Sequence, residues 1–216
     1  MAHPEDGPHQ GQPLVRTGAP LEDAQAAVVL VHGRGATARS ILGMAEAFDA
    51  DGVAHLAPQA AGDAWYPNPF TAPVESNEPG RSSGLRAIGD AIGDANEAGV
   101  PTDRVLVLGF SQGACLAAEY VARNPARYGG LAVLSGGLIG ETVDPDDYDG
   151  DLEGTPVFLG CSDSDPHIAE ERVRESAAIF EELNGDVTTR LYSALGHGVN
   201  RDEIDRVSDM VSQLVE

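Results

Sequence analysis

Residues 104–116, Arg-Val-Leu-Val-Leu-Gly-Phe-Ser-Gln-Gly-Ala-Cys-Leu, constrain the fold of this chain more than any other stretch. The Val and Leu run at 105–108 is typical of a strand buried on both faces, as in a parallel sheet. The G-x-S-x-G pattern at 109–113 then predicts a sharp turn into a helix. Glycine is expected at both ends of that pattern because a Cβ there would collide with the neighbouring strand or helix. The turn would lift the Ser111 hydroxyl above the sheet, beside helix N-terminal N–H groups that favour negative charge.

Apolar runs and helical patterns alternate along the rest of the chain. We expect strands at 12–17, 26–31, 53–57, 130–135, 156–160 and 186–192, and helices at 37–48, 82–98, 114–123, 169–183 and 200–214, the last capped by Asn200 or Asp202. This order predicts an α/β fold with right-handed crossovers and a mostly parallel central sheet flanked by helices on both faces. Ligands of such sheets bind beyond the carboxyl ends of the strands.

The chain is predicted to divide into a short tail and one domain. Residues 1–12 are rich in Pro, Gly and His and are expected to form a flexible N-terminal tail, whereas residues 13–216 form a single α/β domain. Within it, residues 59–81 form a long irregular segment that contains Trp65, Tyr66 and Phe70. Loops of this length are usually functional or disordered, and the aromatic residues favour function. The three aromatic side chains are candidates for lining a substrate pocket; the alternative is that they only attach the loop to the domain.

Charge limits the partners of this chain. It has 35 acidic and 13 basic residues, a net charge of −22, and every basic residue is arginine. Nucleic acid and anionic membranes are poor partners because binding them requires a basic surface. An acidic surface without lysine is what we expect of a protein from a halophile, where dense counterions in a high-salt cytoplasm screen the self-repulsion.

The cysteine count and the absence of targeting patterns favour a cytoplasmic location. Cys115 and Cys161 are too few for a disulfide framework or a zinc site. The sequence shows no signal peptide and no apolar run of membrane-spanning length.

Three polar residues that follow predicted strands suggest nucleophilic acyl transfer. This chemistry needs an activated hydroxyl, a base that takes its proton, and an acid that orients the base. Ser111, an aspartate after residue 160 and His197 occur in the order Ser…Asp…His, which is the order of an α/β-hydrolase. The other candidate bases are weaker: His32 is expected to stabilise the turn after its strand, and neither His55 nor His167 has a matching partner.

Two aspartates compete for the third position. Asp163 lies three residues after Gly160, which fits G-x-x-D at the end of the strand. Asp165 begins Asp-Pro-His-Ile, which fits D-P-x-[VI] before the following helix. One of them is expected to orient His197 and the other to face solvent or cap that helix; we favour Asp165 and keep Asp163 as the alternative.

Hydrogen-bond donors for a tetrahedral intermediate are expected from two backbone N–H groups. Each such donor contributes about 10²–10³ in rate. Gln112 follows the nucleophile directly, and Arg34 lies in the His-Gly-Arg-Gly turn after the strand at 26–31. These two residues are the candidate oxyanion hole.

Taken together, the motifs resemble the phospholipase/carboxylesterase family of α/β-hydrolases, which includes the acyl-protein thioesterases. The resemblance spans about residues 26–213 and is carried by Val-His-Gly-Arg-Gly-Ala at 31–36, Gly-Phe-Ser-Gln-Gly-Ala at 109–114, Asp-Pro-His-Ile at 165–168 and Gly-His at 196–197. Pro-Gln-Ala-Ala-Gly at 58–62 and Trp-Tyr-Pro at 65–67 resemble its bacterial and archaeal carboxylesterases. The chain departs from the family at Ala169, where proline is usual, and by two extra residues in 160–165.

This resemblance implies a serine esterase without a cofactor or metal, largely lidless and often a homodimer. We therefore expect hydrolysis of small to medium carboxylic esters through an acyl-enzyme on Ser111. The alternative is a thioesterase or lysophospholipase that acts on longer acyl chains. A third hypothesis is a non-catalytic binding protein on a hydrolase scaffold.

The halophile interpretation predicts that salt stabilises this protein. Raising KCl from low to multimolar concentration should raise the melting temperature, because counterions screen the repulsion among 35 acidic residues. Thermal unfolding followed by circular dichroism at several KCl concentrations measures this, and a melting temperature that does not change would contradict the interpretation.

Overall fold

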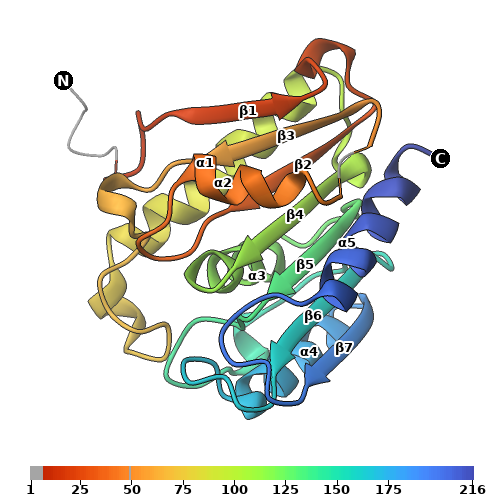
Figure 1. Cartoon of the computed structure of the whole chain (residues 1–216). Helices are drawn as coiled ribbons and strands as arrows, with labels where there is room; N and C mark the ends of the chain where they lie inside the picture. The colour runs from red at the N-terminus through yellow and green to blue at the C-terminus, as the bar shows by residue number, and fades with distance from the viewer. Residues whose placement is uncertain (1–6, 49) are drawn as a thin grey trace.

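A computed structural model describes residues 7–48 and 50–216, and a seven-stranded sheet forms its centre (Figure 1). In spatial order the strands are β1 (Leu14–Gly18), β3 (Val53–Pro58), β2 (Ala26–Val31), β4 (Val105–Phe110), β5 (Gly130–Leu134), β6 (Pro156–Ser162) and β7 (Asp186–Tyr192). All neighbouring strands are parallel except β1, which pairs antiparallel with β3 at one edge. The predicted α/β class is therefore confirmed.

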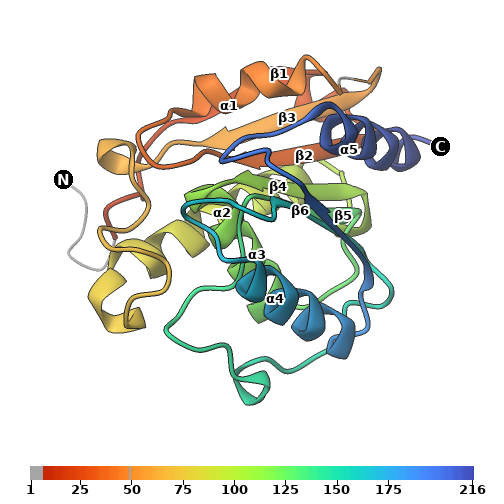
Figure 2. The same cartoon turned by 60° about the horizontal axis from the view of Figure 1, so that its bottom comes forward.

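Helices cover both faces of the sheet (Figure 2). The helices α1 (Ala38–Ala45) and α5 (Arg201–Leu214) lie on one face, and α2 (Gly80–Glu97), α3 (Gln112–Arg123) and α4 (Glu170–Glu182) lie on the other. Each face has its own apolar core, as expected when alternate side chains of a buried strand point to opposite sides. Within the described ranges, no helix is long and apolar enough to cross a membrane.

Most predicted elements form within two residues of their expected ends, and three differences bear on the site. The strand β6 continues two residues beyond the predicted end, to Ser162. Asn200 rather than Asp202 caps α5, and its side chain accepts a hydrogen bond from Glu203 N at 3.0 Å. The irregular segment after β3 is ordered and contains two short 3₁₀ turns, Ala61–Asp63 and Val74–Asn77.

The segment that precedes β1 differs from the expected flexible tail. Residues 1–6, which include His3, lie outside the described residues. From residue 7 onward the chain packs against the domain, and His9 is only 4% exposed. Its backbone N–H donates to Ser83 Oγ, and its ring nitrogens lie within hydrogen-bond distance of Trp65 O and Ala61 N. Partners more than 50 residues away along the chain hold this segment, which local composition could not predict. That residues 13–216 form a single domain stays a proposal.

Candidate active site

The G-x-S-x-G turn between β4 and α3 has the predicted geometry. Ser111 has φ 56° and ψ −122°, a left-handed conformation that non-glycine residues rarely adopt. A Cβ on Gly109 would lie 2.3 Å from Gly113 O, and a Cβ on Gly113 would lie 2.1 Å from Val31 O. Both glycines are therefore required by close backbone contacts, the second of them with the neighbouring strand β2.

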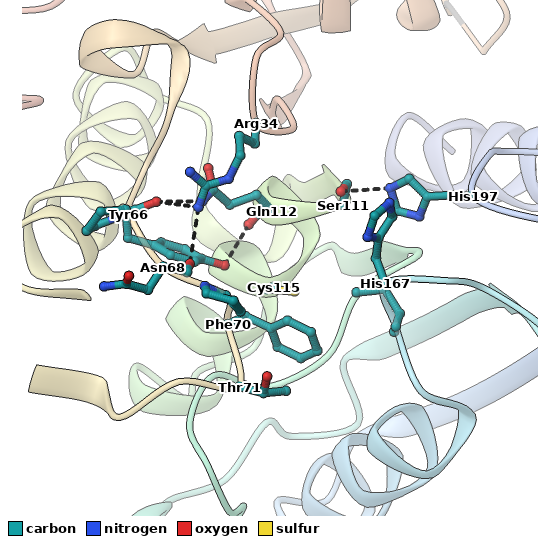
Figure 3. A pocket seen from close by; sticks show the side chains of 13 residues that line it. Arg34, Tyr66, Asn68, Phe70, Thr71, Ser111, Gln112, Cys115, His167 and His197 are labelled. Carbon is teal, nitrogen blue, oxygen red and sulfur yellow. Dashed lines mark hydrogen bonds between the residues drawn. The ribbon is translucent and has the colours of Figure 1, made fainter. Parts of the chain in front are cut away.

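The turn brings Ser111 next to His197, which lies 86 residues further along the chain. Ser111 Oγ is 2.9 Å from His197 Nε2, and His197 Nδ1 is 2.7 Å from Asp165 Oδ2 (Figure 3 shows the first contact). All three residues follow parallel strands, whose carboxyl ends meet at one edge of the sheet. A serine, an imidazole and a carboxylate linked in this order can move a proton from the hydroxyl to the imidazole.

The two candidate aspartates have different partners. The Asp165 side chain is fully buried, and its Oδ1 accepts hydrogen bonds from His167 N and Ile168 N at 2.8 and 3.1 Å. Burial alone would raise the pKa of Asp165, but the hydrogen bonds with His197 and these backbone groups bring the pKa below its usual value. Asp163 is exposed and accepts hydrogen bonds from Ser193 Oγ and Ala194 N instead.

The other histidines occupy different places. His32 is fully buried at the end of β2, where its Nδ1 is 2.8 Å from Gly33 O, as expected for a residue that stabilises this turn. His55 is buried in β3 beside Phe48. His167 is not expected to have a matching partner as a base; its ring lies edge-on to His197, with a centroid separation of 4.9 Å. This contact depends on how the loop after β6 folds back, so residue types alone do not indicate it.

A cavity of about 470 Å³ opens beside Ser111 (Figure 3). Its walls include Arg34, Tyr66, Pro67, Asn68, Pro69, Phe70, Thr71, Gln112, Cys115, His167, Ile168 and His197. Its volume is within the usual range for small-molecule sites, about 300–1,000 Å³. Burial raises the pKa of the Cys115 thiol to about 12, so this thiol stays protonated and is a poor competing nucleophile.

Two of the three aromatic residues predicted to line the pocket do so. Tyr66 and Phe70 border the cavity, but Trp65 does not and is a correction to the prediction. Trp65 is fully buried in the core, and its Nε1 donates to His32 O at 2.8 Å. The reason is that its ring packs against the rings of His9 and His32, with centroid separations of 5.1 and 5.0 Å. Trp65 therefore attaches the loop to the domain, the second of the two roles considered for the aromatic residues.

The candidate oxyanion residues, Arg34 and Gln112, both border the cavity. Gly33, which precedes Arg34, lies close to Ser111: an added Cβ would be 3.4 Å from Ser111 Cβ. Neither the Arg34 nor the Gln112 N–H takes part in the turn, cap or side-chain hydrogen bonds of the described residues. Their side chains bind the irregular segment 59–81, called the aromatic loop below. Arg34 Nη2 and Gln112 Nε2 donate to the same carbonyl, Tyr66 O, at 2.6 and 2.9 Å.

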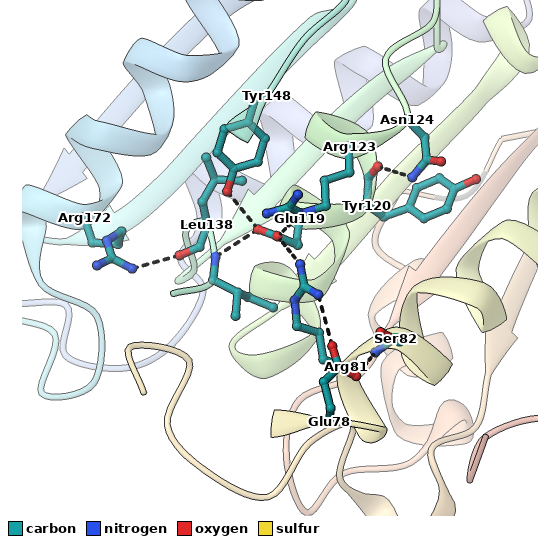
Figure 4. Close-up of polar contacts among 11 residues, drawn as sticks. Glu78, Arg81, Ser82, Glu119, Tyr120, Arg123, Asn124, Leu138, Tyr148 and Arg172 are labelled. Carbon is teal, nitrogen blue, oxygen red and sulfur yellow. Dashed lines mark hydrogen bonds and ion pairs between the residues drawn. The ribbon is translucent and has the colours of Figure 1, made fainter. Parts of the chain in front are cut away.

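A buried charge cluster around Glu119 supports the helix that carries this turn (Figure 4). Glu119 is on α3 and is fully buried; its Oε1 accepts hydrogen bonds from Arg123 on the same helix and from Arg81 on α2, the latter at 2.6 Å. Its Oε2 accepts hydrogen bonds from Ile139 N and Tyr148 Oη at 3.1 and 3.2 Å. The cluster therefore joins α2, α3 and the loop after β5.

Arg172 holds the same loop from α4. Its guanidinium is 5.6 Å from the centre of the Phe70 ring and donates to Leu138 O and Gly140 O. Gly140 N in turn donates to Phe70 O at 2.8 Å. These contacts hold Phe70, which forms part of the cavity wall, in place. Among the described residues, no group of three or more His, Cys, Asp or Glu side chains could hold a metal ion.

Comparison with known proteins matches this geometry to one family. The family model described as Phospholipase/Carboxylesterase matches residues 14–215. The crystal structure of a phospholipase/carboxylesterase from Dyadobacter fermentans superposes with a TM-score of 0.90 at 38% sequence identity, covering 94% of this chain and 97% of that chain.

Curated relatives match more weakly and over shorter stretches. Acyl-protein thioesterase 1 from Neurospora crassa is 24% identical over 57% of this chain, and its counterpart from Kluyveromyces lactis is 26% identical over 63%. The chain matches only 51% and 61% of the length of these two relatives.

The Glu119 cluster yields a stability prediction. Replacing Glu119 with Gln leaves Arg81 and Arg123 without their shared buried carboxylate, so the free energy of unfolding should fall by about 3–5 kcal/mol. Urea unfolding followed by circular dichroism measures the change. The control is Asp205→Asn, which removes the exposed ion pair between Asp205 and Arg201 on α5 and should change stability little. Equal midpoints for the two variants would contradict the assigned role of Glu119.

Proposed function

Because the chain belongs to the phospholipase/carboxylesterase family of α/β-hydrolases, we propose that it is a serine carboxylesterase acting through an acyl-enzyme on Ser111. One observation carries the proposal: the continuous contact from Ser111 Oγ to His197 Nε2, and from His197 Nδ1 to Asp165 Oδ2, at 2.9 and 2.7 Å. The family match and the cavity that opens beside Ser111 support it.

The proposed reaction has two steps. As Ser111 Oγ attacks the ester carbonyl carbon, His197 Nε2 takes the hydroxyl proton and then gives it to the departing alcohol. A water molecule then attacks the acyl carbon as its proton passes to His197, and His197 returns this proton to Ser111 Oγ as the bond to Ser111 breaks and the acid leaves. Asp165 accepts the Nδ1–H of His197, which holds the imidazole in the tautomer that can accept at Nε2, and its lowered pKa keeps it ionised in that role.

We propose the backbone N–H groups of Arg34 and Gln112 as donors to the oxyanion of the tetrahedral intermediate. The position of Gln112 at the first turn of α3 supports this role, because helix N-terminal N–H groups favour negative charge. The contact between Gly33 and Ser111 supports the choice of Arg34.

The cavity favours small to medium esters. Its volume of about 470 Å³ is in the lower half of the usual range for ligand sites, and polar side chains such as Asn68, Thr71 and Gln112 form part of its wall. The alternative is a thioesterase or lysophospholipase acting on longer acyl chains, and the names of the curated relatives support the thioesterase part of it. Measuring kcat/KM for 4-nitrophenyl esters from acetyl to palmitoyl separates the two, since only the alternative predicts a maximum at long chains.

The remaining partners stay proposals. We propose a small-molecule ester or thioester as the substrate, with neither nucleic acid nor membrane bound, and a cytoplasmic location. A homodimer also stays a prediction from the family resemblance.

The first test concerns the nucleophile. Ser111→Ala should abolish turnover of 4-nitrophenyl butyrate, because no hydroxyl remains to form the acyl-enzyme, and should leave the far-ultraviolet circular dichroism spectrum unchanged. A fluorophosphonate should label the wild-type protein at Ser111 and should not label the variant. Full activity in the variant would mean that another residue is the nucleophile, and failure of the wild-type protein to react would favour the non-catalytic binding hypothesis.

A second test uses the two aspartates as a matched pair. Asp165→Asn should lower kcat by about 10³–10⁴-fold, because an amide favours the wrong imidazole tautomer. Asp163→Asn makes the same chemical change on the exposed neighbour and should keep kcat within about threefold, since Asp163 binds Ser193 and Ala194 and contacts neither Ser111 nor His197. Steady-state hydrolysis of 4-nitrophenyl butyrate measures both, and a larger loss in the Asp163 variant would reverse the assignment.

A further inference from the structure

Arg34 presents unused hydrogen-bond donors at the cavity. A guanidinium has five N–H groups, all of them donors. The two on Nη2 donate to Tyr66 O and Asn68 O at 2.6 and 3.1 Å, which ties the side chain to the aromatic loop. The three on Nε and Nη1 have no hydrogen-bond or ion-pair partner among the described residues. Since Arg34 borders the cavity, these donors are available to a molecule bound there.

The charges around this cavity are unusual for so acidic a chain. No aspartate or glutamate is among the described residues that line it. Asp165, the acid behind His197, has both oxygens engaged by His197 and by backbone N–H groups. Asp63, on the neighbouring turn, does not border the cavity, and its Oδ1 accepts a hydrogen bond from Gln59 Nε2. The positive charge of Arg34 therefore faces the cavity without a protein counter-ion.

We infer that the ester substrate carries a carboxylate, and that Arg34 binds this carboxylate through its free N–H groups. A guanidinium that is always charged suits this task, and a hydrogen bond between two charged groups is about twice as strong as a neutral one. Figure 3 shows Arg34 on the Tyr66 side of the cavity, so the carboxylate would be bound there while the ester carbonyl lies at Ser111. This inference rests on the proposed esterase function and adds the charge of the substrate to it.

Two pairs of esters test the inference, each with a carboxamide in place of the carboxylate. Monomethyl glutarate and methyl glutaramate place the group on the acyl side, and 4-acetoxybenzoate and 4-acetoxybenzamide place it on the alcohol side. The values of kcat/KM are measured in 1 M KCl and divided by the rate of alkaline hydrolysis of each ester. In at least one pair the wild-type protein should prefer the carboxylate about tenfold to hundredfold.

The variant Arg34→Gln should lower this preference by about the same factor. The ratio within a pair is the readout, because a general effect of the substitution on catalysis lowers both members and cancels. Arg39→Gln is the matched control: it removes one positive charge from the exposed side of α1, outside the cavity lining, and should leave the ratio unchanged. If Arg34→Gln does not fold, the wild-type preference alone decides.

Each outcome is decisive. A wild-type protein without preference in either pair, or a preference that survives Arg34→Gln, overturns the inference while the esterase function stands. If none of the four esters is hydrolysed although 4-nitrophenyl butyrate is, the inference is overturned and the esterase function stands. If 4-nitrophenyl butyrate is not hydrolysed either, the proposed function fails, and calorimetric binding of glutarate and 4-hydroxybenzoate tests whether Arg34 binds a carboxylate in the cavity. Binding that weakens about tenfold in Arg34→Gln and not in Arg39→Gln supports it; absent or unchanged binding overturns it.

Discussion

The site depends on the close approach of the N-terminus of α3 to the strand β2. The contact is between backbones: a single Cβ on Gly113 would lie 2.1 Å from Val31 O, and one on Gly109 would lie 2.3 Å from Gly113 O. Because no side chain separates these segments, Ser111 is held in its left-handed conformation above the sheet, and the turn at 33–35 lies beside it. Strain of this kind persists only where the surrounding structure enforces it, which the flanking buried strand and helix do here.

Sequence patterns predict the parts of this site that are formed by consecutive residues. Strand, turn and helix around Ser111 are consecutive in the chain, so residue types alone predicted them, and His197 follows a strand end that alternation made visible. The choice between Asp163 and Asp165 is harder to predict because it depends on where β6 ends. The strand runs to Ser162, two residues past the expected end, so Asp163 leaves it directly toward Ser193 and Ala194, whereas Asp165 turns back toward His197.

Contacts between distant segments account for what the sequence left unpredicted. Trp65, like Tyr66 and Phe70, is an aromatic residue of the same segment, so the sequence does not distinguish them. Trp65 differs only in its tertiary packing against His9 and His32. Glu119 is a second example. A glutamate in a helix could equally lie on the exposed face, and its burial follows only from the fold, which brings Arg81 and Tyr148 to its carboxylate. Such burial is set by topology, and residue types do not encode it locally.

The aromatic loop and the proposed oxyanion donors form one unit. Arg34 follows β2 and Gln112 follows β4, yet the side chains of both donate to Tyr66 O. Gln112 Oε1 also accepts from Trp65 N at 2.9 Å, so backbone groups of two adjacent residues bind the loop to the turn that carries Ser111. One carbonyl oxygen therefore fixes the spacing of two residues whose backbone N–H groups must converge on the same developing charge. Donors that are fixed before the reaction cost no reorganisation when the charge forms, so under the proposed mechanism the loop would contribute to catalysis even where it does not touch the substrate.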